Sequence, residues 1–188
     1  MRLLRVPLLL ILMIAPLLAF GQFEQDKVKW SAKVEPSSVR AGESAQIIVT
    51  ATIEKGWHIY GIKQNGGDTR TEIQLGKIDA ITANGEIVEP DPHFLDDPMF
   101  GKLATHGGST NFAIPISVSA DASGTIKGNI KVVFQPCDDK NCLMITEEEV
   151  PINVVVEAGE PRAERLEPML AVPSQPDDHV PGDADAPG

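Results

Sequence analysis

The sequence predicts an all-β protein, an immunoglobulin-like antiparallel β-sandwich. Three observations indicate this class. Apolar and polar residues alternate with a period of two in several short segments, which is typical of strands with one buried face. Turn-forming residues separate these segments, and no stretch carries a helical apolar repeat of useful length. We therefore expect eight or nine short strands in one domain, in an order that the sequence does not determine.

The strands are expected at 28–34, 47–53, 57–60, 73–75, 112–118, 126–134 and 150–154. The pair Asn84-Gly85 lies between Ile81 and the apolar residues 87–88, which is a strong signal for a two-residue hairpin. The connection 89–109 differs from the rest, because its three prolines and three glycines come without any alternation. We expect it to be a long surface loop, a kind of segment that often carries function.

The chain of 188 residues is expected to have three parts. Residues 1–21 have a basic start, an apolar core and a small-residue cleavage site, the pattern of a signal peptide. Residues 22–156 are the size of one domain and contain all the expected strands. Residues 157–188 are rich in proline and acidic residues and are predicted to be a disordered tail. An exported, soluble product follows from this division.

Charge and hydropathy exclude several classes of partner. The net charge of −11 argues against nucleic acid or an anionic membrane surface as a partner. No apolar run after residue 21 approaches the roughly 20 residues of a membrane-spanning helix, so no stable membrane insertion is expected.

Both cysteines of the chain, Cys137 and Cys142, lie in the segment VVFQPCDDKNCLM at 132–144. One strand leads into Cys137, a polar turn covers 138–141, and an apolar strand is expected to leave from Cys142. A disulfide between them would close a ring of six residues, which stabilises by about 2 kcal/mol, against about 4.7 for a hundred-residue ring. A structural staple would be weak here, yet spacing alone leaves a structural disulfide, a redox pair and metal ligands or free thiols all open.

Three motifs point further: Gly56-Trp57-His58-Ile59-Tyr60, then Asp96-Asp97-Pro98-Met99-Phe100-Gly101, then Phe134-Gln135-Pro136-Cys137 with Cys142-Leu143. Together, and in this order, they resemble the N-terminal periplasmic domain of the DsbD family of thiol:disulfide interchange proteins, over most of residues 22–156. The resemblance implies an immunoglobulin-like domain in the periplasm, with a link to cytochrome c biogenesis. It implies that the cysteine pair relays electrons, without a cofactor, from a membrane-embedded reductant to thioredoxin-like partners. We expect a stand-alone protein whose electron donor is a separate chain.

The resemblance also implies roles for single residues. Cys137 and Cys142 would be the catalytic pair, and Cys142 would form the mixed disulfide with the partner. His58 and Tyr60 would lie near the site. A cap loop would cover the cysteines, and its residues here are Asp97, Pro98, Met99, Phe100 and Gly101. The chain differs from the best-known family form in having Met99 in place of an aromatic residue, four residues between the cysteines in place of five, and Met144-Ile145 in place of tandem prolines.

Local charge predicts a weak nucleophile at Cys142. Asp138, Asp139 and the acidic run 147–149 lie close in the sequence, and negative charge near a thiol disfavours its thiolate. Lys140 offsets only part of this charge. Neither a helix N-terminus nor a nearby histidine is expected to lower the thiol pKa.

Two other functions remain open. The first is a binding or adaptor module, with a structural disulfide and with the connection 89–109 as its contact surface. The second is copper handling, for which the candidate ligands are Cys137, Cys142, Met144, Met99 and His106. Soft ligands suit Cu(I), but no histidine lies within the cysteine hairpin and a blue-copper site needs two. No metal ligands are therefore predicted.

Overall fold

The computed structural model describes residues 27–64 and 69–168 of the chain. The expected signal peptide and residues 169–188 of the expected tail lie outside this part. The described residues form eleven strands and one short 3-10 helix: β1 (Val28–Glu35), β2 (Val39–Arg40), β3 (Ser44–Ile53), β4 (Ile59–Tyr60), β5 (Glu72–Leu75), β6 (Ile81–Ala83), β7 (His93–Asp97), β8 (Gly101–His106), β9 (Ser109–Val118), β10 (Gly124–Phe134), β11 (Thr146–Glu157) and η1 (Ala163–Arg165). Within these ranges no helix is long and apolar enough to cross a bilayer.

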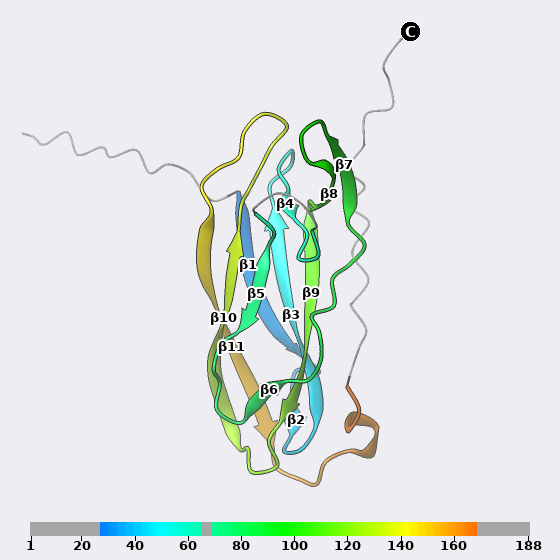
Figure 1. The fold of residues 1–188 in the computed structure, drawn as a ribbon. Coiled ribbons are helices and arrows are strands. Elements are labelled where there is room, and N and C mark those ends of the chain that lie inside the picture. Colours follow the sequence, from blue (N-terminus) through cyan, green and yellow to red (C-terminus); the bar gives the residue numbers. More distant parts are fainter. Residues whose placement is uncertain (1–26, 65–68, 169–188) are drawn as a thin grey trace, which may run out of the picture.

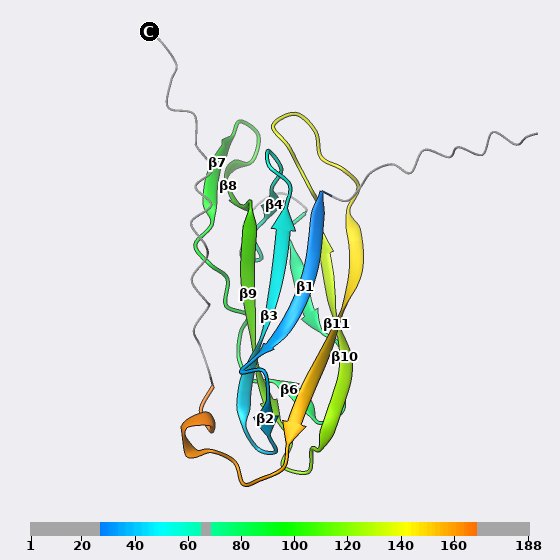
Figure 2. The same cartoon turned by 180° about the vertical axis from the view of Figure 1, so that it is seen from behind.

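Two four-stranded sheets pack face to face in an elongated sandwich (Figure 1). One has the order β1-β3-β9-β6 and the other the order β2-β11-β10-β5. A three-stranded sheet, β4-β8-β7, lies at one end. Neighbouring strands are antiparallel except for β11 and β2, which run parallel. In the view from behind, β9, β3 and β1 lie on the left and centre of the sandwich and β11 and β10 on the right (Figure 2). The expected antiparallel β-sandwich is thus confirmed.

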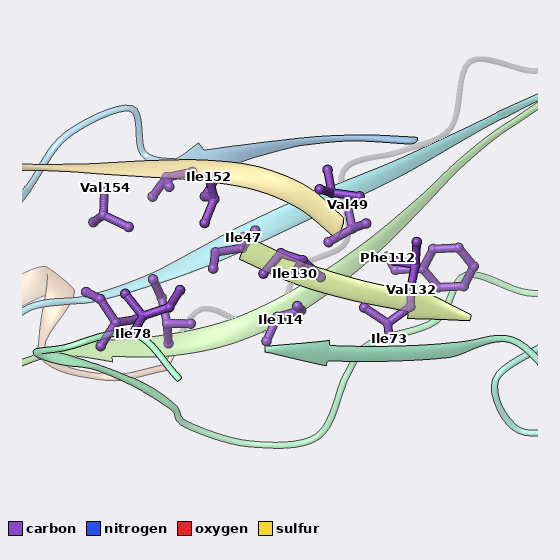
Figure 3. Packing of buried hydrophobic residues seen from close by; sticks show 14 of the residues in the cluster. Ile47, Val49, Ile73, Ile78, Phe112, Ile114, Ile130, Val132, Ile152 and Val154 are labelled. Carbon is purple, nitrogen blue, oxygen red and sulfur yellow. The ribbon is translucent and has the colours of Figure 1, made fainter. Parts of the chain in front are cut away.

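Alternating side chains of the two sheets fill the space between them. Ile47 and Val49 of β3 face Ile130 and Val132 of β10, and all four are fully buried (Figure 3). The inward residues of β11 alternate with exposed ones along the whole second half of the strand. Each fully buried Val, Ile or Phe side chain contributes about 1.5–3 kcal/mol, so this core is the main source of stability.

The prediction of a hairpin at Asn84-Gly85 is wrong. Ile81 pairs with Val118 and Val88 pairs with Ala113, so the chain continues along one edge of β9 and does not fold back on itself. The Asn84 N–H donates a hydrogen bond of 2.8 Å to the carbonyl oxygen of a β9 residue. Gly85 has φ of 139° and allows the chain to bulge there. The free edge of β9 offers backbone partners to both segments, and this outweighs the local turn signal.

The connection 89–109 is not a structureless loop. It contains β7 and β8, which form a hairpin with Leu95 opposite Leu103 and Asp97 opposite Gly101. Strand β8 also pairs with β4, with Ile59 opposite His106. The residues of β7 are exposed or nearly so on both faces, so no apolar alternation marks it as a strand. Strand β7 is held by its backbone ladder to β8, whereas β8 itself buries Leu103, Thr105 and His106.

Packing against the sandwich continues beyond residue 156, where we expected the domain to end. Glu157 belongs to β11, and the residues after it run along the end of the sandwich opposite to the cysteine loop (Figure 1). The Arg162 guanidinium donates two hydrogen bonds of 2.6 Å to the carboxylate of Glu43, which is fully buried. Arg165 donates to the Ser38 carbonyl oxygen at 3.2 Å. The partners of Arg162 and Arg165 come from a distant part of the chain, so the composition of the C-terminal segment did not indicate that it packs on the domain.

The pairing of Glu43 with Arg162 should make the free energy of unfolding depend on pH in the acidic range. The Arg162 side chain, against the opposing effect of burial, lowers the pKa of Glu43 from 4.5 to about 2. Backbone N–H groups of Arg162 and Arg40 add to this lowering. A carboxylate with a depressed folded pKa contributes stability that is complete above about pH 4.5 and is lost as the pH falls towards about 2.

We expect Glu43→Gln to lower the free energy of unfolding at pH 7 by about 2 kcal/mol, because hydrogen bonds to a charged group are lost. The variant should also lose part of the stability change between pH 4.5 and pH 2. Urea denaturation across this pH range measures both effects. The control is Glu54→Gln, which removes an exposed pair with Lys27 and should cost less than about 0.5 kcal/mol. Equal effects of the two variants would contradict the role of Glu43.

Candidate functional site

Cys137 and Cys142 form a disulfide in the connection between β10 and β11, with Cα atoms 4.1 Å apart. The connection rises at one end of the sandwich (Figure 1). Its turn is held by the Asp138 carboxylate, which accepts hydrogen bonds from the N–H groups of Lys140 at 2.7 Å and Asn141 at 2.6 Å. The apolar strand expected to begin at Cys142 is absent from the described residues, since Cys142 pairs only with Cys137 and β11 starts at Thr146.

The two cysteine residues differ in their access to solvent. Cys137 is 1% exposed, whereas Cys142 is exposed. The difference arises because Cys137 is covered on one side by the segment that leads into β4, while Cys142 lies on the outer arm of the loop beside the exposed Met144 and Ile145. A thiolate arriving from solution can therefore reach Cys142 but not Cys137.

His58 is the neighbour of Cys137 across the strand pair. The His58 N–H donates to the Cys137 carbonyl oxygen at 2.8 Å, and the Cys137 N–H donates to the His58 carbonyl oxygen at 2.9 Å. Cys137 also pairs with Cys142, so His58, Cys137 and Cys142 form one cross-strand row. Residues directly opposite each other in antiparallel pairs project to the same face. The His58 imidazole consequently shares a face with the disulfide.

Tyr60 completes this face. It follows His58 by two residues and so projects to the same side. Its hydroxyl lies 4.0 Å from the Cys142 sulfur, and its ring contacts the His58 ring edge-on at 5.8 Å between centroids. Burial, and to a smaller degree the charge of Asp97, raises the pKa of Tyr60. The phenol therefore stays protonated at neutral pH and can donate to sulfur.

The charges around the disulfide act in opposite directions. Burial lowers the pKa of His58, while the carboxylates of Asp139 and Asp138 oppose that lowering. The N–H groups of Lys140 and Asn141 lower the pKa of Asp138, so this group is ionised at neutral pH. The resemblance placed His58 near the site, whereas the argument from local charge expected no histidine near the thiols. That second expectation is wrong, because His58 reaches Cys137 through strand pairing from a distant part of the chain.

The residues expected to form a cap loop are the tip of the β7–β8 hairpin. The Asp97 carboxylate accepts the N–H groups of Met99 at 2.7 Å and Phe100 at 2.8 Å, and Gly101 closes the turn with φ of 77°. The tip, which also includes Pro98, rises at the same end of the sandwich as the cysteine loop (Figure 1). Met99 is 83% and Phe100 53% exposed. In this conformation the tip leaves its apolar side chains in solvent, and its role as a cap stays a prediction.

Glu89 is a residue that the sequence reasoning missed. Its carboxylate is buried, lies 2.9 Å from the Nε2 atom of His106 and accepts the Ile62 N–H at 2.6 Å. His106, a copper candidate, thus has an acidic partner beside it. Among the residues that the structure describes, no three His, Cys, Asp or Glu side chains gather as a metal site. An acidic residue at the start of a Pro-rich segment gave no sequence signal for burial.

The comparisons with known proteins agree with this geometry. Residues 25–153 match the family model described as thiol:disulfide interchange protein DsbD, N-terminal. No curated protein matches the chain.

Several solved structures are similar to this one. The N-terminal periplasmic domain of ScsB from Proteus mirabilis is 16% identical with a TM-score of 0.46, and the match covers 68% of this chain but only 47% of that one. The N-terminal domain of DsbD from Neisseria meningitidis in the reduced form is 15% identical with a TM-score of 0.44, over 67% of this chain and 86% of that one. The complex of DsbD and PilB N-terminal domains from the same organism matches at 16% identity and a TM-score of 0.41, over 65% and 80% of the two chains.

The family model covers well over half of the 188 residues and includes the disulfide, the His58 segment and the β7–β8 hairpin. The chain belongs to the family of DsbD N-terminal domains of thiol:disulfide interchange proteins.

Proposed function

We propose that this protein exchanges thiols and disulfides in the periplasm through Cys137 and Cys142. In this proposal it takes reducing equivalents from a membrane-embedded dithiol and passes them to thioredoxin-like partners. Membership of the DsbD N-terminal family supports the class of reaction. The direction of transfer and the two kinds of partner belong to the proposal.

The observation that carries the proposal is the difference in exposure between the two cysteine residues. A structural disulfide has no need for one exposed sulfur, whereas a relay must offer one sulfur to its partner and keep the other out of solution. Cys142 is exposed and Cys137 is 1% exposed, which supports the second arrangement. A disulfide that closes so small a ring stabilises the folded state only slightly, which favours a redox role over a structural one.

The exchange takes place in two steps. A thiolate of the reductant attacks the Cys142 sulfur, the bond to Cys137 breaks, and its electron pair goes to the Cys137 sulfur. The second thiolate of the reductant then attacks the mixed disulfide, which releases Cys142 and leaves the reductant oxidised. The reduced pair later repeats these steps in reverse on an oxidised partner, with Cys142 as the attacking thiolate.

An adaptor role with a structural disulfide remains the second candidate, because one observation favours it. The β7–β8 hairpin exposes four large apolar side chains, namely Phe94, Leu95, Met99 and Phe100. Large exposed apolar residues that gather on one element mark interaction surfaces. The reduction potential separates the two functions, since a structural disulfide resists reduction and a relay pair does not.

We expect the disulfide to titrate in glutathione buffers with a midpoint above about −270 mV, the value typical of thioredoxin. The reasons are the small ring and the exposed Cys142 sulfur. Trapping the thiols by alkylation and counting the labels by mass spectrometry gives the midpoint. A bond that stays oxidised down to about −300 mV would make the disulfide structural and would favour the adaptor role.

We expect Cys137→Ala, produced in a bacterial periplasm, to accumulate a mixed disulfide between Cys142 and a thioredoxin-like protein. The variant lacks the sulfur that would displace the partner, so the intermediate persists. Non-reducing electrophoresis and mass spectrometry identify the trapped protein. Cys142→Ala is the matched control and should trap at least about tenfold less, because its remaining sulfur is buried. Equal trapping by both variants would contradict the assigned roles.

We also propose that the hairpin tip closes over the thiols of the reduced protein. Closure would bury the Met99 and Phe100 side chains, each with a gain on the order of 1 kcal/mol. Replacing both with Gly should therefore raise the rate of iodoacetamide alkylation of the reduced protein about fivefold or more. Phe94→Gly, at the outer strand of the same hairpin, is the control and should leave the rate unchanged. If the tip variant also leaves the rate unchanged, the tip is no cap and its apolar residues serve only for contact with partners.

A further inference from the structure

The His58 imidazole shares a face with the disulfide and has no part in the exchange as described so far. It lies opposite Cys137 in a hydrogen-bonded strand pair, and its ring contacts Tyr60, whose hydroxyl is 4.0 Å from the Cys142 sulfur. The ring is partly buried. A titratable side chain therefore lies opposite Cys137 in the strand pair and contacts the ring whose hydroxyl is beside the Cys142 sulfur.

Opening the disulfide places a negative charge on the sulfur of a buried residue, Cys137. The electron pair of the broken bond goes to the Cys137 sulfur, which is 1% exposed. Burial disfavours a thiolate, and a leaving thiol of high pKa slows the exchange. Water has almost no access to this sulfur, so a proton or a hydrogen bond must come from a neighbouring protein group.

Few groups around the sulfur can carry that proton. Those that face His58 or the disulfide are Tyr60, Asp138 and Asp139, with Asp97 acting on Tyr60 and Lys140 beside Asp138. Burial raises the pKa of Tyr60, so the phenol gives up no proton at neutral pH. Asp138 is held in its ionised form and has no proton to give. Among these groups the imidazole is the one that both takes and gives a proton between pH 5 and pH 8.

We propose that His58 is the acid that protonates the Cys137 sulfur when a partner thiolate opens the disulfide, and the base that removes this proton when the disulfide forms again. The inference rests on the thiol–disulfide exchange proposed above. In the opening step the incoming thiolate bonds to Cys142, the bond between the cysteines breaks, and Cys137 receives the electron pair. A protonated His58 then gives its proton to the Cys137 sulfur and is left as the neutral imidazole.

The charges near His58 suit both directions of this transfer. Burial lowers the pKa of the imidazole and keeps it neutral at rest, so it can accept a proton. The carboxylates of Asp139 and Asp138 oppose this lowering and so favour the protonated form that gives the proton. An acid–base group works best when its pKa lies near the working pH.

The test is the pH dependence of disulfide reduction by dithiothreitol between pH 5 and pH 8. The second-order rate constant is divided by the thiolate fraction of dithiothreitol at each pH, so that the titration of the reagent is removed. We expect this corrected rate constant to rise on the order of tenfold as the pH falls and His58 becomes protonated. In His58→Gln it should change by less than about twofold, because the amide carries no titratable proton.

Two further variants keep the test independent of any folding defect in His58→Gln. Asp139→Asn, at an exposed turn position, should move the midpoint of the rise to lower pH, because a charge that raises the pKa of His58 is removed. Tyr60→Phe should keep the rise. A corrected rate constant that is flat in the unmodified protein, or that still rises in His58→Gln, overturns the inference while leaving the exchange function intact. A disulfide that dithiothreitol does not reduce at any pH overturns both.

Discussion

Two backbone hydrogen bonds between His58 and Cys137 determine the arrangement of side chains around the disulfide. They join the segment that leads into β4 to the loop between β10 and β11, two parts of the chain that are far apart in sequence. The pairing shields Cys137 from solvent and leaves Cys142 on the outer arm of its loop. It also directs the His58 and Tyr60 side chains to the face of the disulfide, because opposed residues of an antiparallel pair project to the same side.

The β4 segment can hold this position because a buried polar contact fixes the residues after it. The Glu89 carboxylate accepts the Ile62 N–H and contacts His106 at the end of β8. The chain passes so close that a Cβ atom at Gly61 would lie 2.7 Å from a Glu89 carboxylate oxygen, which only glycine avoids. Together with the pairing of Tyr60 with Thr105 of β8, these contacts join β4 to the base of the β7–β8 hairpin.

Packing and reactivity are separated along the sandwich. The long strands β3, β9, β10 and β11 contribute most of the apolar core, and the reactive sulfur lies beyond the end of two of them. The ion pair of Glu43 with Arg162 anchors the C-terminal segment at the opposite end. The disulfide and this ion pair thus lie at opposite ends of the sandwich.

The sequence by itself determined the β-sandwich, the family and the cysteine pair. Alternating apolar residues and short motifs are local patterns, and local patterns can be recognised without knowledge of the fold. The strands β7 and β8, the continuous pairing along β9 at Gly85, the place of His58 beside Cys137 and the burial of Glu43 and Glu89 were decided by the tertiary structure. Each depends on a backbone edge or a charged partner supplied by a distant segment, and no pattern within a few residues carries that information.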